Sequence, residues 1–359
     1  MIWMTYGSNW FIHFGAISGY LPKIGGRATC NMETGALDIR ARGRRVELFA
    51  QFGLFRPTGG VGYAQVLNEN VEFFIGWRPY SNRVWPLSFD KRSFKAFCSA
   101  NGVSVPRLWT RPEDVEADVL IKRAVSSFSE GISGPYTPAM AKSSGRALAN
   151  GEFFEEFILG DIIKIWYWNA APVCLEVIPM PTVTGDGTRT LRQLIKRIKV
   201  PHFECDRQEC QAMAEYQGLS LDAVVPNGRR ALVEFRYQSL LHPVSPEFPN
   251  ANVLAKFAGT PLMEQLRRSG EVFWRGIPDR VRQNTLFTVD GILDRNGTAR
   301  FLEINSNPAA HPDVYPAMLE GLFAADAVGQ TSRPPVPLLQ PAPATGPAHS
   351  SDGGLACPR

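Results

Sequence analysis

The chain lacks the features that mark several common classes of protein. Its six cysteines show no CxxC pair and no dense spacing, which predicts reduced thiols and excludes a disulfide scaffold. No apolar run approaches the roughly 18 residues of a membrane span. The net charge is only +4, too small for a nucleic-acid-binding surface. These absences predict a soluble, cytoplasmic protein that binds neither nucleic acid nor membranes.

Two familiar nucleotide-binding signatures are also missing. The sequence contains neither the GxxxxGK[ST] phosphate loop nor the GxGxxG dinucleotide motif. A zinc site made by His202, Cys205 and Cys210 is an alternative, but a fourth ligand is missing. What remains is the composition of a globular enzyme, with 359 residues, 44% of them hydrophobic and 20% charged. The chain is long enough for two or three subdomains and a sizeable core.

Residues 287–308 are the most informative stretch, because they predict a β-hairpin that ends in an oxygen-rich site. Two apolar runs flank the tetrad 294–297, which contains Asn-Gly, a strong hairpin signal. The folded hairpin would bring Asp290 near Glu303 and Asn305, and the last two share one face of their strand. Two carboxylates and a carboxamide suit Mg²⁺ and leave room for phosphate oxygens. The alternative is a solvated hairpin with acidic ends.

Two lysines and a small-residue loop precede this hairpin in a definite order. Lys95 lies in a helix predicted over 90–98, and Lys122 lies near the end of a predicted strand. The loop 126–134 follows, and its Gly and Ser residues let backbone N–H groups approach a polyphosphate. Either lysine alone could be a surface residue. Their order before the acidic hairpin favours a phosphate-binding site.

Other segments predict secondary structure but no chemistry of their own. Residues 153–158 read as a strand, and 161–168 with 173–178 read as a hairpin. A capping box from Thr190 to Gln193 predicts the start of a helix.

The sequence divides into four predicted parts. Residues 1–88 form an N-terminal domain of short strands whose fold we do not assign, with an arginine cluster at 40–45. That cluster predicts an exposed hairpin, with a substrate-docking patch as the alternative. A small subdomain over 89–154 and a large one over 155–330 follow. Residues 331–359 are dominated by Pro, Ala, Gly and Ser, which predicts a disordered tail.

Taken together, the motifs over about residues 88–325 resemble the ATP-grasp superfamily of carboxylate–amine ligases. Two further segments look most like cyanophycin synthetase and related amino-acid or peptide ligases. The matching segments are Asp90-Lys91-x3-Lys95 with Gly102-Val-Ser-Val-Pro106, Lys122 with Ser126 to Gly131, Glu155 to Asp161, the set Asp290, Glu303 and Asn305, and the two ligase-like segments 182–195 and 218–228.

The resemblance implies an α+β, ATP-grasp fold in which two subdomains clasp ATP. It implies Mg²⁺, with Mn²⁺ as an alternative, bound by Asp290, Glu303 and Asn305. Arg229, Arg236 and Arg282 are the arginines whose positions best suit a substrate carboxylate. Contacts to ATP are implied for Lys95, Lys122, Ser126, Ser129, Gly131, Glu155, Glu156, Ile158 and Asp161.

The implied reaction activates a carboxylate as an acyl phosphate, with release of ADP, and an amine then displaces phosphate to form an amide. Amino acids or peptides are the expected substrates, and a peptide or protein acceptor and a homodimer are left open. An ATP-binding protein without ligase activity and a small-molecule kinase are the alternatives.

Two departures from the family concern substrate or phosphate contacts. Asp161-Ile-Ile163 followed by Lys164 replaces an Asp-x-Arg, and Phe235-Arg-Tyr-Gln-Ser239 replaces an Asn-Leu-Ser-Thr-Gly-Gly stretch. They leave the substrate less certain than the ATP chemistry.

Overall fold

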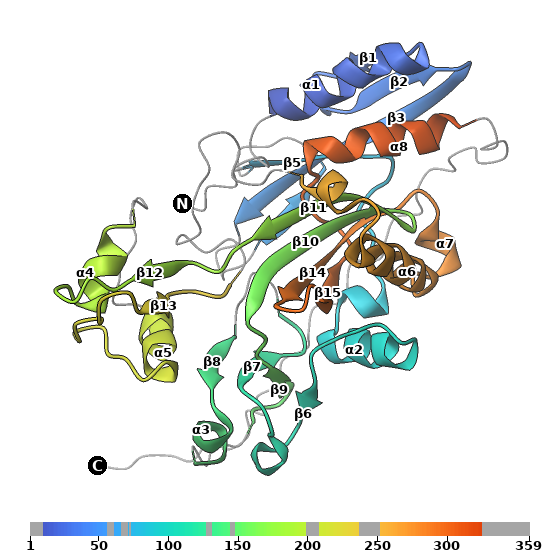
Figure 1. Cartoon of the computed structure of the whole chain (residues 1–359). Coiled ribbons are helices and arrows are strands. Elements are labelled where there is room, and N and C mark those ends of the chain that lie inside the picture. Colours follow the sequence, from blue (N-terminus) through green and yellow to red (C-terminus); the bar gives the residue numbers. More distant parts are fainter. Residues whose placement is uncertain are drawn as a thin grey trace, which may run out of the picture. The chain divides into compact units, whose positions relative to one another are not determined.

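A computed structural model describes most of the chain and combines helices with antiparallel sheets (Figure 1). This arrangement confirms the α+β prediction. No helix within the described segments is long and apolar enough to cross a membrane. The predicted tail lies outside the described residues. These residues are 10–55, 61–65, 71, 73–126, 131–143, 148–198, 208–236 and 252–324.

The N-terminal region is a five-stranded antiparallel sheet with helix α1. Strands β1 to β4 are neighbours in order, and β5 pairs with β3. Helix α8, near the end of the described chain, shares the hydrophobic core of this sheet. There the Tyr315 hydroxyl lies 2.7 Å from Nδ1 of His13 and accepts the Trp77 backbone N–H. The elements are α1 (Trp10–Tyr20), η1 (Leu21–Ile24), β1 (Arg27–Cys30), β2 (Leu37–Ala41), β3 (Arg44–Phe55), β4 (Val61–Ala64), β5 (Phe73–Arg78) and α8 (Tyr315–Phe323).

A second sheet has the strand order β6-β9-β7-β8. Helix α2 precedes it in sequence, but its buried residues Phe94 and Cys98 belong to the core of the large sheet. The boundary predicted between residues 154 and 155 falls inside β9, so one strand carries residues assigned to two subdomains. The elements are η2 (Pro86–Ser88), α2 (Lys91–Ala100), β6 (Leu108–Trp109), η3 (Pro112–Asp114), β7 (Val119–Arg123), β8 (Ser133–Tyr136), α3 (Pro138–Ser143) and β9 (Glu152–Glu156).

The large sheet has the order β11-β10-β14-β15 and is built from the two predicted hairpins, both of which are confirmed. Helix α6 packs close to it at Gly270. A Cβ on Gly270 would lie 2.3 Å from the Ala170 carbonyl oxygen and 2.6 Å from the Tyr167 ring, so only glycine permits this approach. The elements are β10 (Gly160–Trp168), β11 (Ala171–Ile178), η4 (Leu254–Phe257), α6 (Pro261–Arg275), α7 (Asp279–Arg282), β14 (Leu286–Asp294), β15 (Ala299–Asn305) and η5 (Pro312–Val314).

A smaller unit with its own hydrophobic core lies within the segment predicted as the large subdomain. The capping box predicted there is confirmed, because the Thr190 hydroxyl accepts the Gln193 backbone N–H and the Gln193 side chain accepts the Thr190 N–H. Its elements are β12 (Thr182–Thr184), α4 (Leu191–Lys196), α5 (Gln208–Tyr216) and β13 (Arg230–Leu232).

Candidate functional site

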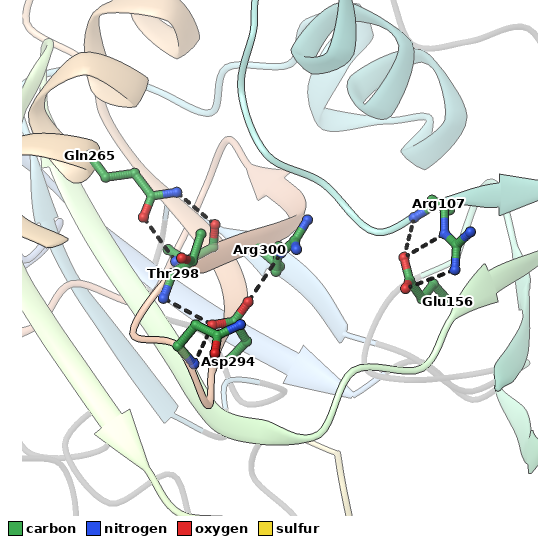
Figure 2. A network of polar contacts seen from close by, with 8 residues as sticks. Arg107, Glu156, Gln265, Asp294, Thr298 and Arg300 are labelled. Atoms are coloured by element: carbon green, nitrogen blue, oxygen red, sulfur yellow. Dashed lines mark hydrogen bonds and ion pairs between the residues drawn. The ribbon is translucent and has the colours of Figure 1, made fainter. Parts of the chain in front are cut away.

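The β14–β15 hairpin is fixed in place at its tip by polar contacts (Figure 2). Gln265 on α6 donates to the Ala299 carbonyl oxygen at 2.8 Å and accepts the Ala299 N–H at 2.9 Å. Asp294 accepts the backbone N–H groups of Asn296 and Thr298. These contacts hold the turn and thereby the register of the two strands that carry the predicted metal ligands.

A row of charged residues crosses the large sheet from strand to strand. Glu176, Lys164, Asp290 and Glu303 are successive register partners on β11, β10, β14 and β15. The Lys164 ammonium lies 2.7 Å from Oδ1 of Asp290. At the end of the row, Nζ of Lys91 on α2 lies 2.8 Å from Oε2 of Glu303. The two predicted metal-binding carboxylates therefore lie side by side on one face of the sheet, and each is paired with a lysine.

Asn305 completes this cluster as predicted. Its Nδ2 donates to Oδ2 of Asp290 at 2.9 Å, which directs the carboxamide at the carboxylates. Thr288, the register partner of Asn305, is fully buried, and its hydroxyl has no hydrogen-bond partner among the described residues. Burial raises the pKa of Asp290, and the charge of Glu303 adds to this, despite the opposing effect of Lys164.

The residues present suit a hard divalent cation. They offer carboxylate and carboxamide oxygens, the ligands that Mg²⁺ prefers, and the unpartnered buried hydroxyl adds a further oxygen on the same face. No group of three His, Cys, Asp or Glu side chains able to hold a metal occurs in the part of the chain that the structure describes. The third oxygen that this face offers belongs to an amide, that of Asn305. Of the alternative zinc ligands, His202 and Cys205 lie outside the described residues. The described cysteines Cys30, Cys98, Cys174 and Cys210 form no disulfide.

A second cluster joins the two predicted phosphate lysines through one carboxylate. Glu155 on β9 is 1% exposed, Lys95 on α2 3% and Lys122 on β7 6%. Nζ of Lys95 lies 2.6 Å from Oε2 of Glu155, and Lys122 donates to Oε1. Burial lowers the pKa of Lys95. At Glu155 burial acts to raise the pKa, but the two lysines outweigh it and the pKa is lowered. Two ammonium groups share one carboxylate, so this cluster has a formal charge of +1 and is almost inaccessible to water.

A cleft connects the two clusters. Its free volume is about 80 Å³. Its apolar lining includes Leu120, Phe157, Met180 and Ile292. Seven residues predicted as site residues also line it, namely Lys122, Glu155, Glu156, Ile158, Arg236, Asp290 and Glu303. The cleft therefore places an apolar wall next to cations and carboxylates.

Two lining residues have partners outside the two clusters. Glu156 pairs with Arg107, and Figure 2 shows this contact beside the hairpin network. Arg236 pairs with Glu234 at 2.5 Å. Both guanidinium–carboxylate pairs are held in place before any substrate arrives.

Several predicted site residues lie away from the cleft lining. Ser126 accepts a hydrogen bond from Lys91 at its carbonyl oxygen, and Ser129 lies outside the described residues. Gly131 and Asp161 do not line the cleft. Lys95 does not line the cleft, but it contacts Glu155, which does.

The structure gives two of the three predicted substrate arginines other partners. Arg229 donates to the Gln217 carbonyl oxygen. Arg282 donates to the carbonyl oxygens of Ile277 and Arg275, where it secures the turn after α6. Neither lines the cleft. Their contact with a substrate carboxylate stays a prediction.

Three residues at the site, Lys91, Lys164 and Glu176, are not among those predicted from the sequence. Each of the three nevertheless has a signal in the sequence. Lys164 and Glu176 each stand between apolar neighbours in the middle of a strand, and a charge buried in such a place needs a partner. For Lys91, the signal is its position four residues before Lys95, one turn away on the same helix.

No family model and no curated protein matches the chain. Among solved structures, the chain is similar to a bifunctional glutathione synthetase from Pasteurella multocida, with 12% identity, a TM-score of 0.39, and coverage of 84% of this chain and 41% of that one. It is similar to a D-alanine–D-alanine ligase from Bacillus anthracis complexed with ATP, with 13% identity, a TM-score of 0.32 and 66% of each chain covered. It is also similar to the ATP-grasp ligase PsnB complexed with a minimal precursor, with 12% identity, a TM-score of 0.31, and coverage of 65% and 61%. The chain spans less than half the length of the first of these proteins.

Proposed function

We propose that the protein is an ATP-dependent, ADP-forming carboxylate–amine ligase of the ATP-grasp type. One observation carries this proposal. A single apolar cleft is bounded by the Lys122–Glu155 pair on one side and by the carboxylates of Asp290 and Glu303 on the other. Such a site can hold a base in its apolar part and a polyphosphate between lysines and a metal-binding face.

The lysine cluster is the proposed phosphate-binding wall. Lys122 lines the cleft and would contact phosphate oxygens directly. Glu155 orients Lys122 and, through its second oxygen, Lys95. The buried excess positive charge is stabilised when an anion arrives, because electrostatic interactions strengthen where water is excluded.

The acidic row would hold Mg²⁺ through Asp290, Glu303 and Asn305. When bound, Mg²⁺ neutralises charge on the transferred phosphoryl group. Lys164 holds Asp290 in position at 2.7 Å and supplies a second cation on the same face.

The proposed reaction has two steps. A substrate carboxylate oxygen attacks the γ-phosphorus of ATP, the bond to the β-phosphate oxygen breaks, and ADP leaves. An amine nitrogen then attacks the acyl carbon, loses a proton, and releases phosphate as the amide forms. Arg236 lines the cleft and is the proposed contact for a substrate carboxylate. Amino acids or peptides are the proposed substrates.

The test is a screen for ADP release over pairs of amino acids and short peptides, followed by mass spectrometry of the product. Hydroxylamine should trap the acyl phosphate as a hydroxamate, whereas a kinase would release ADP without one. Lys122→Met should abolish both signals. The control Lys142→Met changes an exposed lysine on α3 and should leave both unchanged. ADP release without hydroxamate or amide for any active substrate would overturn the ligase proposal.

A further inference from the structure

Both carboxylates proposed to bind the metal already have a cation in contact. Oδ1 of Asp290 lies 2.7 Å from the Lys164 ammonium, and Oε2 of Glu303 lies 2.8 Å from the Lys91 ammonium. The side chains of both lysines are only 12% exposed, so water screens these pairs poorly. A metal ion that binds these oxygens must share them with two fixed ammonium groups or displace those groups.

The local charge makes this costly for a metal ion alone. Together with Glu176, the row has three carboxylates and two lysines, a formal charge of −1. A bare divalent cation would also lie close to both ammonium groups, and Mg²⁺ gives up its water shell reluctantly. A nucleoside triphosphate makes metal binding favourable, since its oxygens can bind the metal and the lysines at the same time.

We propose that Lys91 and Lys164 are built-in counter-ions that exclude Mg²⁺ from this site until nucleotide phosphates arrive. The metal then enters together with the nucleotide, and the two bind with strong mutual dependence. The nucleotide in this inference rests on the proposed function, whereas the exclusion of metal from the nucleotide-free protein does not.

Lys91 is suited to exchange partners because it has a second set of contacts. Its ammonium lies 2.6 Å from the carbonyl oxygen and 3.2 Å from the hydroxyl of Ser126, and its backbone N–H donates to Ala124. When Glu303 turns to a metal, the ammonium keeps these oxygens and is not left unpaired. Release of the carboxylate therefore avoids most of the cost of an isolated buried charge.

The experiment measures metal binding directly and needs no turnover. Mn²⁺ is the probe, and electron paramagnetic resonance gives the free ion with and without a non-hydrolysable ATP analogue. In the wild-type protein we expect the analogue to tighten Mn²⁺ binding by at least about tenfold. Lys91→Met should tighten Mn²⁺ binding without nucleotide by about ten- to hundredfold, the scale of a charge-assisted contact. In Lys91→Met the analogue should therefore raise the affinity for Mn²⁺ by a smaller factor than in the wild type.

Two control variants separate the counter-ion role from a change in fold. Lys91→Arg keeps the positive charge and should behave as the wild type. Arg92→Met changes the next residue, which is exposed, and should also leave metal binding unchanged. Thermal melting should show that each variant is folded.

Three outcomes are informative. Tight Mn²⁺ binding by the nucleotide-free wild type, or equal metal affinity in Lys91→Met and the wild type, overturns the inference. If no variant binds the analogue while Lys91→Met still binds Mn²⁺ more tightly than the wild type, the counter-ion role stands and the ATP-dependent function fails.

Discussion

Replacing Glu155 with glutamine would remove the one carboxylate that two buried lysines share. Lys95 and Lys122 contact its two oxygens, and all three side chains are less than a tenth exposed. Removing one partner of a buried ion pair costs about 3–5 kcal/mol, because the remaining charge stays buried without compensation. Here two ammonium groups would lose their counter-ion at once. We expect Glu155→Gln to lower the free energy of unfolding by about this amount at pH 7.

The neighbouring residue on β9 provides a matched control. Glu156 pairs with Arg107, whose side chain is 52% exposed. Exposed pairs of this kind contribute less than about 1 kcal/mol, so Glu156→Gln should cause only a small loss. Urea denaturation of the nucleotide-free variants, followed by tryptophan fluorescence, measures both values. If the free energies of unfolding of Glu155→Gln and Glu156→Gln differ by less than about 1 kcal/mol at pH 7, Glu155 does not stabilise the two buried lysines as a shared counter-ion.

The difference in stability between the wild type and Glu155→Gln depends on pH in a defined way. The pKa of Glu155 in the folded protein is lowered from its ordinary value of 4.5. A carboxylate with a depressed pKa contributes stability that is fully present above its unfolded pKa and is lost as the pH falls through the folded one. The difference in stability between wild type and Glu155→Gln should therefore be constant near neutrality. It should shrink below about pH 4.5. A difference that grows on acidification would contradict the sign of this shift.

Three further variants test the site and its scaffold. Lys122→Ala should weaken binding of a non-hydrolysable ATP analogue by about ten- to hundredfold in calorimetry, and unchanged affinity would remove this lysine from the site. Glu303→Gln should abolish Mg²⁺-dependent ATP turnover without lowering the melting temperature. The control Glu271→Gln changes an exposed residue on α6 and should retain turnover. Wild-type turnover in Glu303→Gln would end the metal assignment. Gly270→Ala should destabilise the protein by about 1–3 kcal/mol in urea, because its Cβ would press on the Ala170 carbonyl oxygen in the β10–β11 turn and on the Tyr167 ring. An unchanged midpoint would show that α6 can shift.

Local signals in the sequence were sufficient to predict the elements that carry the proposed metal site. The Asn-Gly turn and the alternation around Glu303 predicted the β14–β15 hairpin and the shared face of Glu303 and Asn305. The Thr190–Gln193 pair predicted the start of α4. These predictions succeeded because turns, caps and strand faces depend on residues close together in the chain.

Only the tertiary structure decided which charges meet. The sequence predicted Lys95, Lys122 and Glu155 as contacts to ATP without pairing them, and folding joins them in one buried cluster. It also brings Lys91 to Glu303 from a helix far away in the sequence. Ion pairing depends on distance in space and on loss of water, and neither leaves a periodic pattern along the chain. The sequence thus determined the strands and the side chains that they carry. The contacts of α2 with Glu303 and Glu155, and the pairing of β10 with β14, determined which lysine meets each carboxylate.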